Sequence, residues 1–226
     1  MRVPTASSDS KHPSPLPRRA WLGRVVPGAL GLSAMTGGLV PPQAHSREKF
    51  KHVIIDPGHG GKDPGGRGYG LVEKELTLDT SFRLEKVLAS KGIKVSLTRR
   101  DDTFIPLEDR AGMANASEGA IFVSIHYNSH VDRSISGTET FYFPGSNSSR
   151  QLATYIQSEL GRRLTSRNRG SKPEILKVLE VTRGTAALVE CGFISNRWES
   201  QRCGAEWFRQ IIAEEIAQGI IRYRLP

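Results

Sequence analysis

Short apolar runs alternate along residues 45–226 with segments in which apolar residues recur every three or four positions. The first pattern is typical of buried strands, and the second is typical of helices with one apolar face. Strands are expected at 52–56, 93–98, 120–127, 137–143, 175–179 and 185–191, and helices at 73–91, 107–116, 149–164 and 205–223. This alternation predicts a single α/β domain: an open, mostly parallel, twisted sheet of about six strands with helices on both faces.

Two of the predicted helices have especially clear features. Gly92 follows the first helix at the position where a glycine commonly ends a helix. The last helix carries an apolar stripe that includes Phe208, Ile212, Gly219 and Ile220. We therefore expect the last helix to close the core.

Residues 1–44 do not fit the domain pattern. Arg18 and Arg19 precede a weakly apolar run that ends in small residues before Ala44, which is the order of an export signal. The arginine pair followed by apolar residues resembles a twin-arginine signal. Arg24, Pro27 and several glycines interrupt the run, which disfavours a membrane-spanning helix of about 20 apolar residues.

The sequence thus predicts a cleaved export signal at 1–44, a mature domain at 45–226 and a location in the periplasm or cell wall. An uncleaved anchor and a plain disordered tail are the alternatives to this interpretation.

The charge of the chain changes little of this picture. The net charge is +9, from 32 basic and 23 acidic residues, but residues 1–44 hold five of the basic side chains and one of the acidic ones. The mature domain would therefore carry +5. No basic stripe interleaved with aromatic residues follows, so nucleic acid is not expected as a partner.

The two cysteines, Cys191 and Cys203, could form a disulfide in an exported protein. We favour two separate thiols that pack as small apolar groups.

Candidate chemistry begins in the glycine-rich turn after the first predicted strand, with His59 at its centre. The spacing of the glycines matches neither a dinucleotide-binding turn nor a phosphate-binding loop. Glycines on both sides of an imidazole instead indicate close backbone approach, which lets His59 project into a cleft.

Three further polar residues are expected at the same rim. His126 and Glu190 each end an apolar strand, and Glu73 begins the first helix. Ligands of open α/β sheets bind beyond the carboxyl ends of the strands, so these side chains should converge. Each residue alone is weakly informative, but two imidazoles and a carboxylate form a catalytic zinc set, with a further carboxylate needed for proton transfer.

The mature sequence resembles the zinc-dependent N-acetylmuramoyl-L-alanine amidases, specifically the amidase type 3 catalytic domain, almost from end to end. The matching blocks are IDPGHGGKDPG at 55–65, EK at 73–74, LTR at 97–99, LEDR and AN between 107 and 115, FVSIHYN at 122–128 and LVECGF at 188–193. The resemblance implies that His59, Glu73 and His126 bind one zinc ion per chain and that Glu190 is the catalytic carboxylate. It also implies peptidoglycan as the substrate, with cleavage of the amide bond between the lactyl group of N-acetylmuramic acid and L-alanine.

Several nearby polar residues have two interpretations. Glu75 competes with Glu73 as a ligand, although the family motif favours Glu73. Glu139 either lines the rim or is a solvated residue of an edge strand. Asp63 either orients a histidine or only makes a turn.

Asp56 is a second candidate for orienting a histidine. Arg99 and Arg110 are interpreted as structural ion-pair partners rather than substrate clamps. His52, His130, Cys191 and Trp207 are taken as structural.

Two rival functions use the same residues: a zinc peptidase that cuts within the stem peptide, and an inactive wall-binding module. The resemblance argues against both, because the family motifs and all four polar residues are present. Division amidases of the family often carry a long insertion, with a helix that covers the zinc, after the strand at 137–143. Here only a short loop precedes the next helix, so we expect an open cleft and no need for an activator protein.

Overall fold

A computed structural model describes residues 49–225, so the predicted export signal at 1–44 lies outside the described residues. The principal sheet has six strands in the order β4-β1-β5-β8-β6-β7. Their bounds are β1 His52–Pro57, β4 Lys94–Leu97, β5 Ala120–Asn128, β6 Thr138–Tyr142, β7 Asn168–Pro173 and β8 Thr185–Phe193. A small hairpin, β2 Arg67–Gly68 and β3 Leu71–Val72, stands apart from this sheet.

Strand direction decides which side chains share the rim of the sheet. The strands β4, β1, β5 and β8 pair in parallel, so their carboxyl ends meet at one edge. Strand β6 pairs antiparallel with β8, and β7 pairs in parallel with β6. The predicted mostly parallel sheet is confirmed, and the reversal brings the starts of β6 and β7 beside the end of β8.

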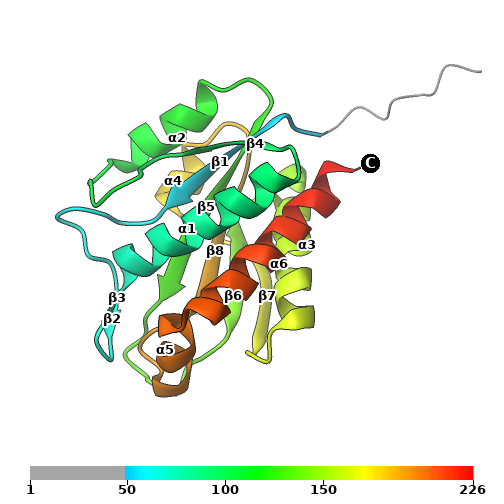
Figure 1. Cartoon of the computed structure of the whole chain (residues 1–226). Helices are drawn as coiled ribbons and strands as arrows, with labels where there is room; N and C mark the ends of the chain where they lie inside the picture. Colours follow the sequence, from blue (N-terminus) through cyan, green and yellow to red (C-terminus); the bar gives the residue numbers. More distant parts are fainter. Residues whose placement is uncertain (1–48, 226) are drawn as a thin grey trace, which may run out of the picture. The chain divides into compact units, whose positions relative to one another are not determined.

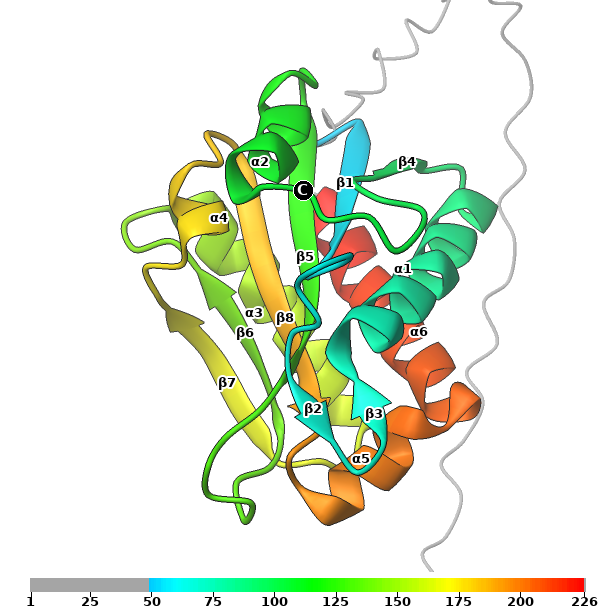
Figure 2. The same ribbon diagram turned by 90° about the vertical axis from the view of Figure 1, so that its left-hand side faces the viewer.

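Helices cover both faces of the sheet, as predicted (Figures 1 and 2). Helices α1 Glu73–Ser90, α3 Asn147–Arg163 and α6 Glu206–Arg224 lie over one face, with α5 Arg197–Gly204 before α6. The opposite face carries α2 Leu107–Asn115 and α4 Lys177–Glu180. These two helices pack on the first halves of β5 and β8, against Phe122 and Ala186.

The larger part of the core lies under α1, α3 and α6. Ile212, Ile216 and Ile220 are fully buried there, which confirms that the last helix closes the core. A Cβ at Gly219 would lie 2.4 Å from the backbone of Ile156, so this glycine permits the close contact between α6 and α3. Gly92 follows α1 with φ 71°, as its predicted role at the helix end requires.

One predicted element is wrong, and the sequence did not predict β7 or α5. Residues 177–179 of the strand expected at 175–179 lie instead in the one-turn helix α4, where Val178 and Leu179 are buried. Ile175 precedes this helix and is 68% exposed. The sixth strand is instead β7, which pairs in parallel with β6. Its sequence is polar and lacks the alternation of a strand, so the sequence did not predict it. Helix α5 is also absent from the sequence-based expectation.

The state of the cysteines agrees with the expectation from the sequence. Cys191 and Cys203 are both buried free thiols, as favoured above. None of the helices within residues 49–225 combines the length and apolar character needed to cross a membrane.

Candidate active site

The glycine-rich turn after β1 presents His59 in a left-handed backbone conformation, with φ 62°. This conformation is uncommon for a residue with a Cβ and is found most often at functional sites. Nδ1 of His59 hydrogen-bonds to Oδ2 of Asp63 across 2.8 Å, and the amide of Gly65 donates to Oδ1 of Asp63. Asp63 therefore orients His59 and shapes the turn, so both of its proposed roles are present.

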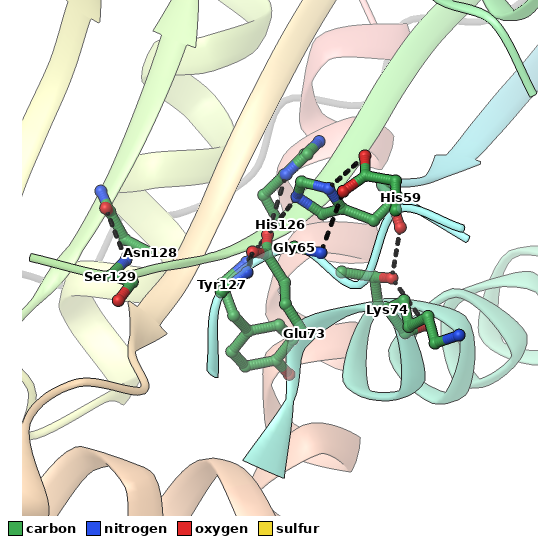
Figure 3. A network of polar contacts seen from close by, with 12 residues as sticks. His59, Gly65, Glu73, Lys74, His126, Tyr127, Asn128 and Ser129 are labelled. Atoms are coloured by element: carbon green, nitrogen blue, oxygen red, sulfur yellow. Dashed lines mark hydrogen bonds and ion pairs between the residues drawn. The ribbon is translucent and has the colours of Figure 1, made fainter. Parts of the chain in front are cut away.

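Glu73 is the first residue of α1, and its carboxylate is the centre of the site (Figure 3). Its Oε1 lies 3.0 Å from Nε2 of His59 and 2.9 Å from Nδ1 of His126, and it accepts a hydrogen bond from the amide of Tyr127. Its Oε2 accepts a 2.7 Å hydrogen bond from the amide of Gly66. Glu73 is 5% exposed and lies beside both histidines, whereas Glu75 is exposed to solvent.

His126 reaches the site from the end of β5. The pairing of β5 with β8 shifts between His126 and Asn128, an irregularity of the kind that redirects side chains beside active sites. A Cβ at Gly58 would lie 2.4 Å from Nε2 of His126, and one at Gly65 would lie 2.5 Å from Cδ2 of His59. The glycines thus leave room for both rings.

The three side chains have the donor chemistry and spacing of a metal site. His59, Glu73 and His126 each offer one ligand atom, and these atoms all lie within 4.8 Å of one another. Zinc prefers imidazole and carboxylate ligands at about 2.0–2.2 Å, and a catalytic site supplies three of them. The hydrogen bond from Nδ1 of His59 to Asp63 leaves Nε2 as the ligand atom, which is the usual arrangement of a zinc-bound histidine. The residues present therefore fit a zinc ion.

The electrostatics also favour a cation among these groups. Burial by itself would raise the pKa of Glu73, but hydrogen bonds from His126 and His59 hold that pKa well below its usual range. Burial opposes protonation of His59, yet the hydrogen bonds and charges of Glu73 and Asp63 raise the pKa of His59 above its usual value. Each group stabilises the charged form of its neighbour, so positive charge is favourable at the point where the three meet.

Glu190 lies in the second half of β8, directly beside His126, its partner in the β5–β8 register. Its Oε2 is buried and has no hydrogen-bond partner among the residues that the structure describes. Burial, followed by the charges of Glu73 and Glu139, raises the pKa of Glu190 well above its usual value. A carboxyl group of this kind is suited to accept a proton and release it again.

A pocket of about 310 Å³ adjoins the two histidines on the side of β1 and α2. Its wall includes the apolar side chains of Phe104, Leu107 and Val178. These residues stood in no recognisable motif, so the sequence did not reveal them.

Asp56 does not orient a histidine, contrary to the expectation. It is buried, and it accepts hydrogen bonds from Arg110 at 3.0 Å, from Thr98 and from Ser124. Arg110 also donates to the carbonyls of Pro57 and His59, so the ion pair supports the turn from behind. The predicted role of Arg110 as a structural ion-pair partner is confirmed.

Arg99 is structural in a different way from the one expected. Its guanidinium donates to the backbone carbonyls of Pro57, Gly58, Asp101 and Lys74. It therefore holds the turn by hydrogen bonds to carbonyls rather than by an ion pair.

Glu139 is not a solvated edge residue. Strand β6 lies inside the sheet, and Glu139 faces Glu190 in the β6–β8 register with only 4% of its surface exposed. Arg169 and Lys172 of β7 both pair with it. Sequence reasoning missed these two cations because it did not predict β7 as a strand.

A family model described as N-acetylmuramoyl-L-alanine amidase matches residues 53–222. The germination-specific N-acetylmuramoyl-L-alanine amidase of Bacillus subtilis is 34% identical over 189 residues, which cover 76% of this chain and 79% of the relative.

Solved structures show the same similarity. An N-acetylmuramoyl-L-alanine amidase from Clostridium difficile 630 superposes with a TM-score of 0.74 and 36% identity, over 78% of this chain and 97% of that one. The CwlD amidase from Clostridioides difficile, solved in complex with the GerS lipoprotein, superposes with a TM-score of 0.73 and 33% identity, over 76% of this chain and 98% of that one.

Proposed function

The chain belongs to the family of N-acetylmuramoyl-L-alanine amidases, and from this premise we propose that His59, Glu73 and His126 hold one zinc ion and that Glu190 transfers the proton. The activity is hydrolysis of the amide bond between the lactyl group of N-acetylmuramic acid and L-alanine in peptidoglycan. The enzyme therefore acts on the cell wall.

One observation carries the assignment of the ligands. Nitrogen atoms of His59 and His126 converge from two different elements on the same oxygen of Glu73. Two imidazoles and one carboxylate that converge in this way are the donor set of a catalytic zinc site. Asp63 holds the ring of His59 from its other side and keeps Nε2 available.

The residues of the chain divide the chemistry between binding and proton transfer. A bound zinc ion supplies Lewis acidity, which polarises the scissile carbonyl and makes water a better nucleophile near neutral pH. Oε2 of Glu190, which has no partner among the described residues, accepts a proton from the attacking water. Glu190 then donates that proton to the departing amine of L-alanine.

A pair of variants tests this division of roles. His126→Ala should lose both zinc and activity, because a site with three protein ligands cannot spare one imidazole. Glu190→Gln should keep stoichiometric zinc but turn over at least about 100-fold more slowly, the scale of lost acid–base catalysis. The exposed Glu118 supplies the matched control, and Glu118→Gln should retain zinc and activity.

Zinc content is measured by metal analysis, and the products are identified after digestion of peptidoglycan. The amidase releases peptides with N-terminal L-alanine, whereas a stem peptidase would leave that residue on the sugar. Loss of zinc from Glu190→Gln would make Glu190 a ligand and refute its assignment as the proton carrier.

We also propose that residues 1–44 export the enzyme by the twin-arginine route and are then removed. The proposal rests on Arg18 and Arg19 and the weakly apolar run after them. Replacing both arginines with lysine should retain the full-length protein inside the cell. Unchanged export of that variant would contradict the twin-arginine route.

A further inference from the structure

The zinc ligands and Glu190 belong to a polar band that runs across one face of the sheet. His126 faces Glu190 in the register of β5 and β8, and Glu190 faces Glu139 in the register of β8 and β6. Arg169 and Lys172 of the edge strand β7 complete the band, since both contact the carboxylate of Glu139. The band therefore begins at the proposed metal site and ends in two cations.

These two cations are held in place rather than extended into solvent. Nε of Arg169 lies 3.1 Å from Oε2 of Glu139, and Nζ of Lys172 lies 2.5 Å from the same oxygen. The guanidinium of Arg169 also lies 5.2 Å from the centre of the Phe193 ring. A Cβ at Gly137 would lie 2.9 Å from Cγ of Arg169, so this glycine leaves space for the arginine.

The charges of this cluster are not balanced. Two cations share one carboxylate, and the ion pairs that they form within residues 49–225 are both with Glu139. The side chain of Arg169 is 22% exposed and that of Lys172 is 41% exposed, so both remain open to a second anion. Charge-assisted hydrogen bonds from two such cations are strong and select for a carboxylate.

The opposite side of the metal ligands has a different character. The pocket beside His59 and His126 has an apolar wall of Phe104, Leu107 and Val178. Arg110 also lines it but is paired with Asp56, so the pocket offers no unpaired cation to a carboxylate. The substrate has the same asymmetry about its scissile amide. One side is a neutral sugar with its lactyl group, and the other is a peptide with free carboxylates.

We propose that Arg169 and Lys172 bind a free carboxylate of the stem peptide and so set the direction in which the substrate lies across the site. This inference rests on the proposed function. The second stem residue is a glutamate linked through its side chain, which leaves its α-carboxylate free unless that group is amidated.

The distances are compatible with this carboxylate. Neighbouring strands lie about 4.8 Å apart, so cations that contact Glu139 of β6 lie roughly 10 Å from β5, the strand that carries His126. An extended chain spans about 3.5 Å per residue, so the carboxylate of the second residue lies about 7 Å from the scissile bond. The sugar then occupies the side of Phe104.

The test compares two synthetic muramoyl tripeptides that differ only at the glutamate, with a free α-carboxylate in one and a carboxamide in the other. The zinc-loaded protein should show a KM at least about 10-fold lower for the free acid, with similar kcat, because hydrogen bonds to charged groups are the stronger ones. Arg169→Gln combined with Lys172→Gln should remove that preference by raising the KM for the free acid. Arg169→Lys should retain a large part of it.

The ratio between the two substrates separates recognition from a structural effect. Loss of the ion pairs with Glu139 also disturbs the neighbourhood of Glu190, but that disturbance slows both substrates equally. Arg222, which pairs with the buried Glu159 in another part of the domain, gives the matched control, and Arg222→Gln should keep the preference.

Two results would overturn the inference. If the wild-type protein cleaves both substrates with the same KM, or if the preference survives the double variant, the cations do not bind the stem. If the wild-type protein cleaves neither substrate between the sugar and L-alanine, the proposed function fails together with the inference.

Discussion

Asp63 accepts a hydrogen bond from Nδ1 of His59 at 2.8 Å, four residues further along the same turn. The contact fixes which nitrogen of His59 faces Glu73 and His126. A carboxylate in this position also increases the basicity of the ligating nitrogen.

Asp63→Ala should therefore weaken zinc binding by about 10–100-fold, the usual effect of removing such a partner. Competition with a chelator measures the affinity. Asp109→Asn, at an exposed aspartate of α2, serves as the control and should bind zinc normally. Equal affinities for Asp63→Ala and the wild type would show that the turn alone orients His59.

Gly58→Ala should impair the site by steric conflict, because a Cβ there would lie 2.4 Å from the ring of His126. We expect zinc affinity to fall at least about 10-fold as the ring is displaced. The matched control is Gly112→Ala in α2, where no atom lies within 4 Å of the added Cβ. That substitution should stabilise the domain by about 0.5–1 kcal/mol. Normal zinc binding by Gly58→Ala would mean that the turn can move away.

Asp56→Ala should destabilise the domain by about 3–5 kcal/mol, because it leaves the charge of Arg110 buried without its carboxylate. Urea unfolding measures the loss. A single variant as stable as the wild type would show that water or another group compensates the arginine.

The free energy of unfolding of the domain should depend on pH through Glu159. Burial would raise the pKa of this carboxyl, but hydrogen bonds from Arg222 and Arg162 lower it below its ordinary value of 4.5. The unfolded chain therefore binds the proton more readily, so the contribution to stability is complete above pH 4.5 and is lost as the pH falls.

Glu159→Gln should cost about 1 kcal/mol at pH 7, a modest value because both arginines are half-exposed or more. The difference from the wild type should shrink as urea unfolding is repeated at lower pH below 4.5. A difference that does not change with pH would mean that the carboxylate charge is not responsible.

The enzyme should need no activator. Only residues 143–146 connect β6 to α3, which confirms the short loop predicted there and leaves no room in it for a blocking helix. Zinc-loaded protein should release peptides from isolated peptidoglycan without a partner protein. If it binds zinc but remains inactive until a partner is added, the hairpin formed by β2 and β3 becomes the candidate for blocking the site.

The sequence predicted the proposed site better than it predicted the fold around it. His59 follows β1, and His126 and Glu190 lie near the carboxyl ends of β5 and β8, so the rule that these ends meet at one edge was enough to bring the three residues together. Glu73 lies beside the histidines because it is the first residue of α1, which begins directly after the β2–β3 hairpin.

Residues whose surroundings depend on distant parts of the chain were less accessible. Asp56 lies close to His59 in sequence, yet its ion-pair partner Arg110 is 54 residues away. Strand β7 has a polar sequence, and it is held by β6 and by the contact of Asn168 with Gln157 of α3. No local pattern records such contacts, so Arg169 and Lys172 could be associated with the site only from the structure.

The two edges of the sheet affect how copies of the enzyme behave toward one another. An exposed strand edge can pair with the same edge of a second molecule and begin aggregation, and charged side chains or proline prevent this. Strand β4 carries the exposed Lys94 on one edge, and β7 carries Arg169, Lys172 and Pro173 on the other. The cations of β7 should therefore also keep the protein monodisperse at high concentration, a property that light scattering can follow.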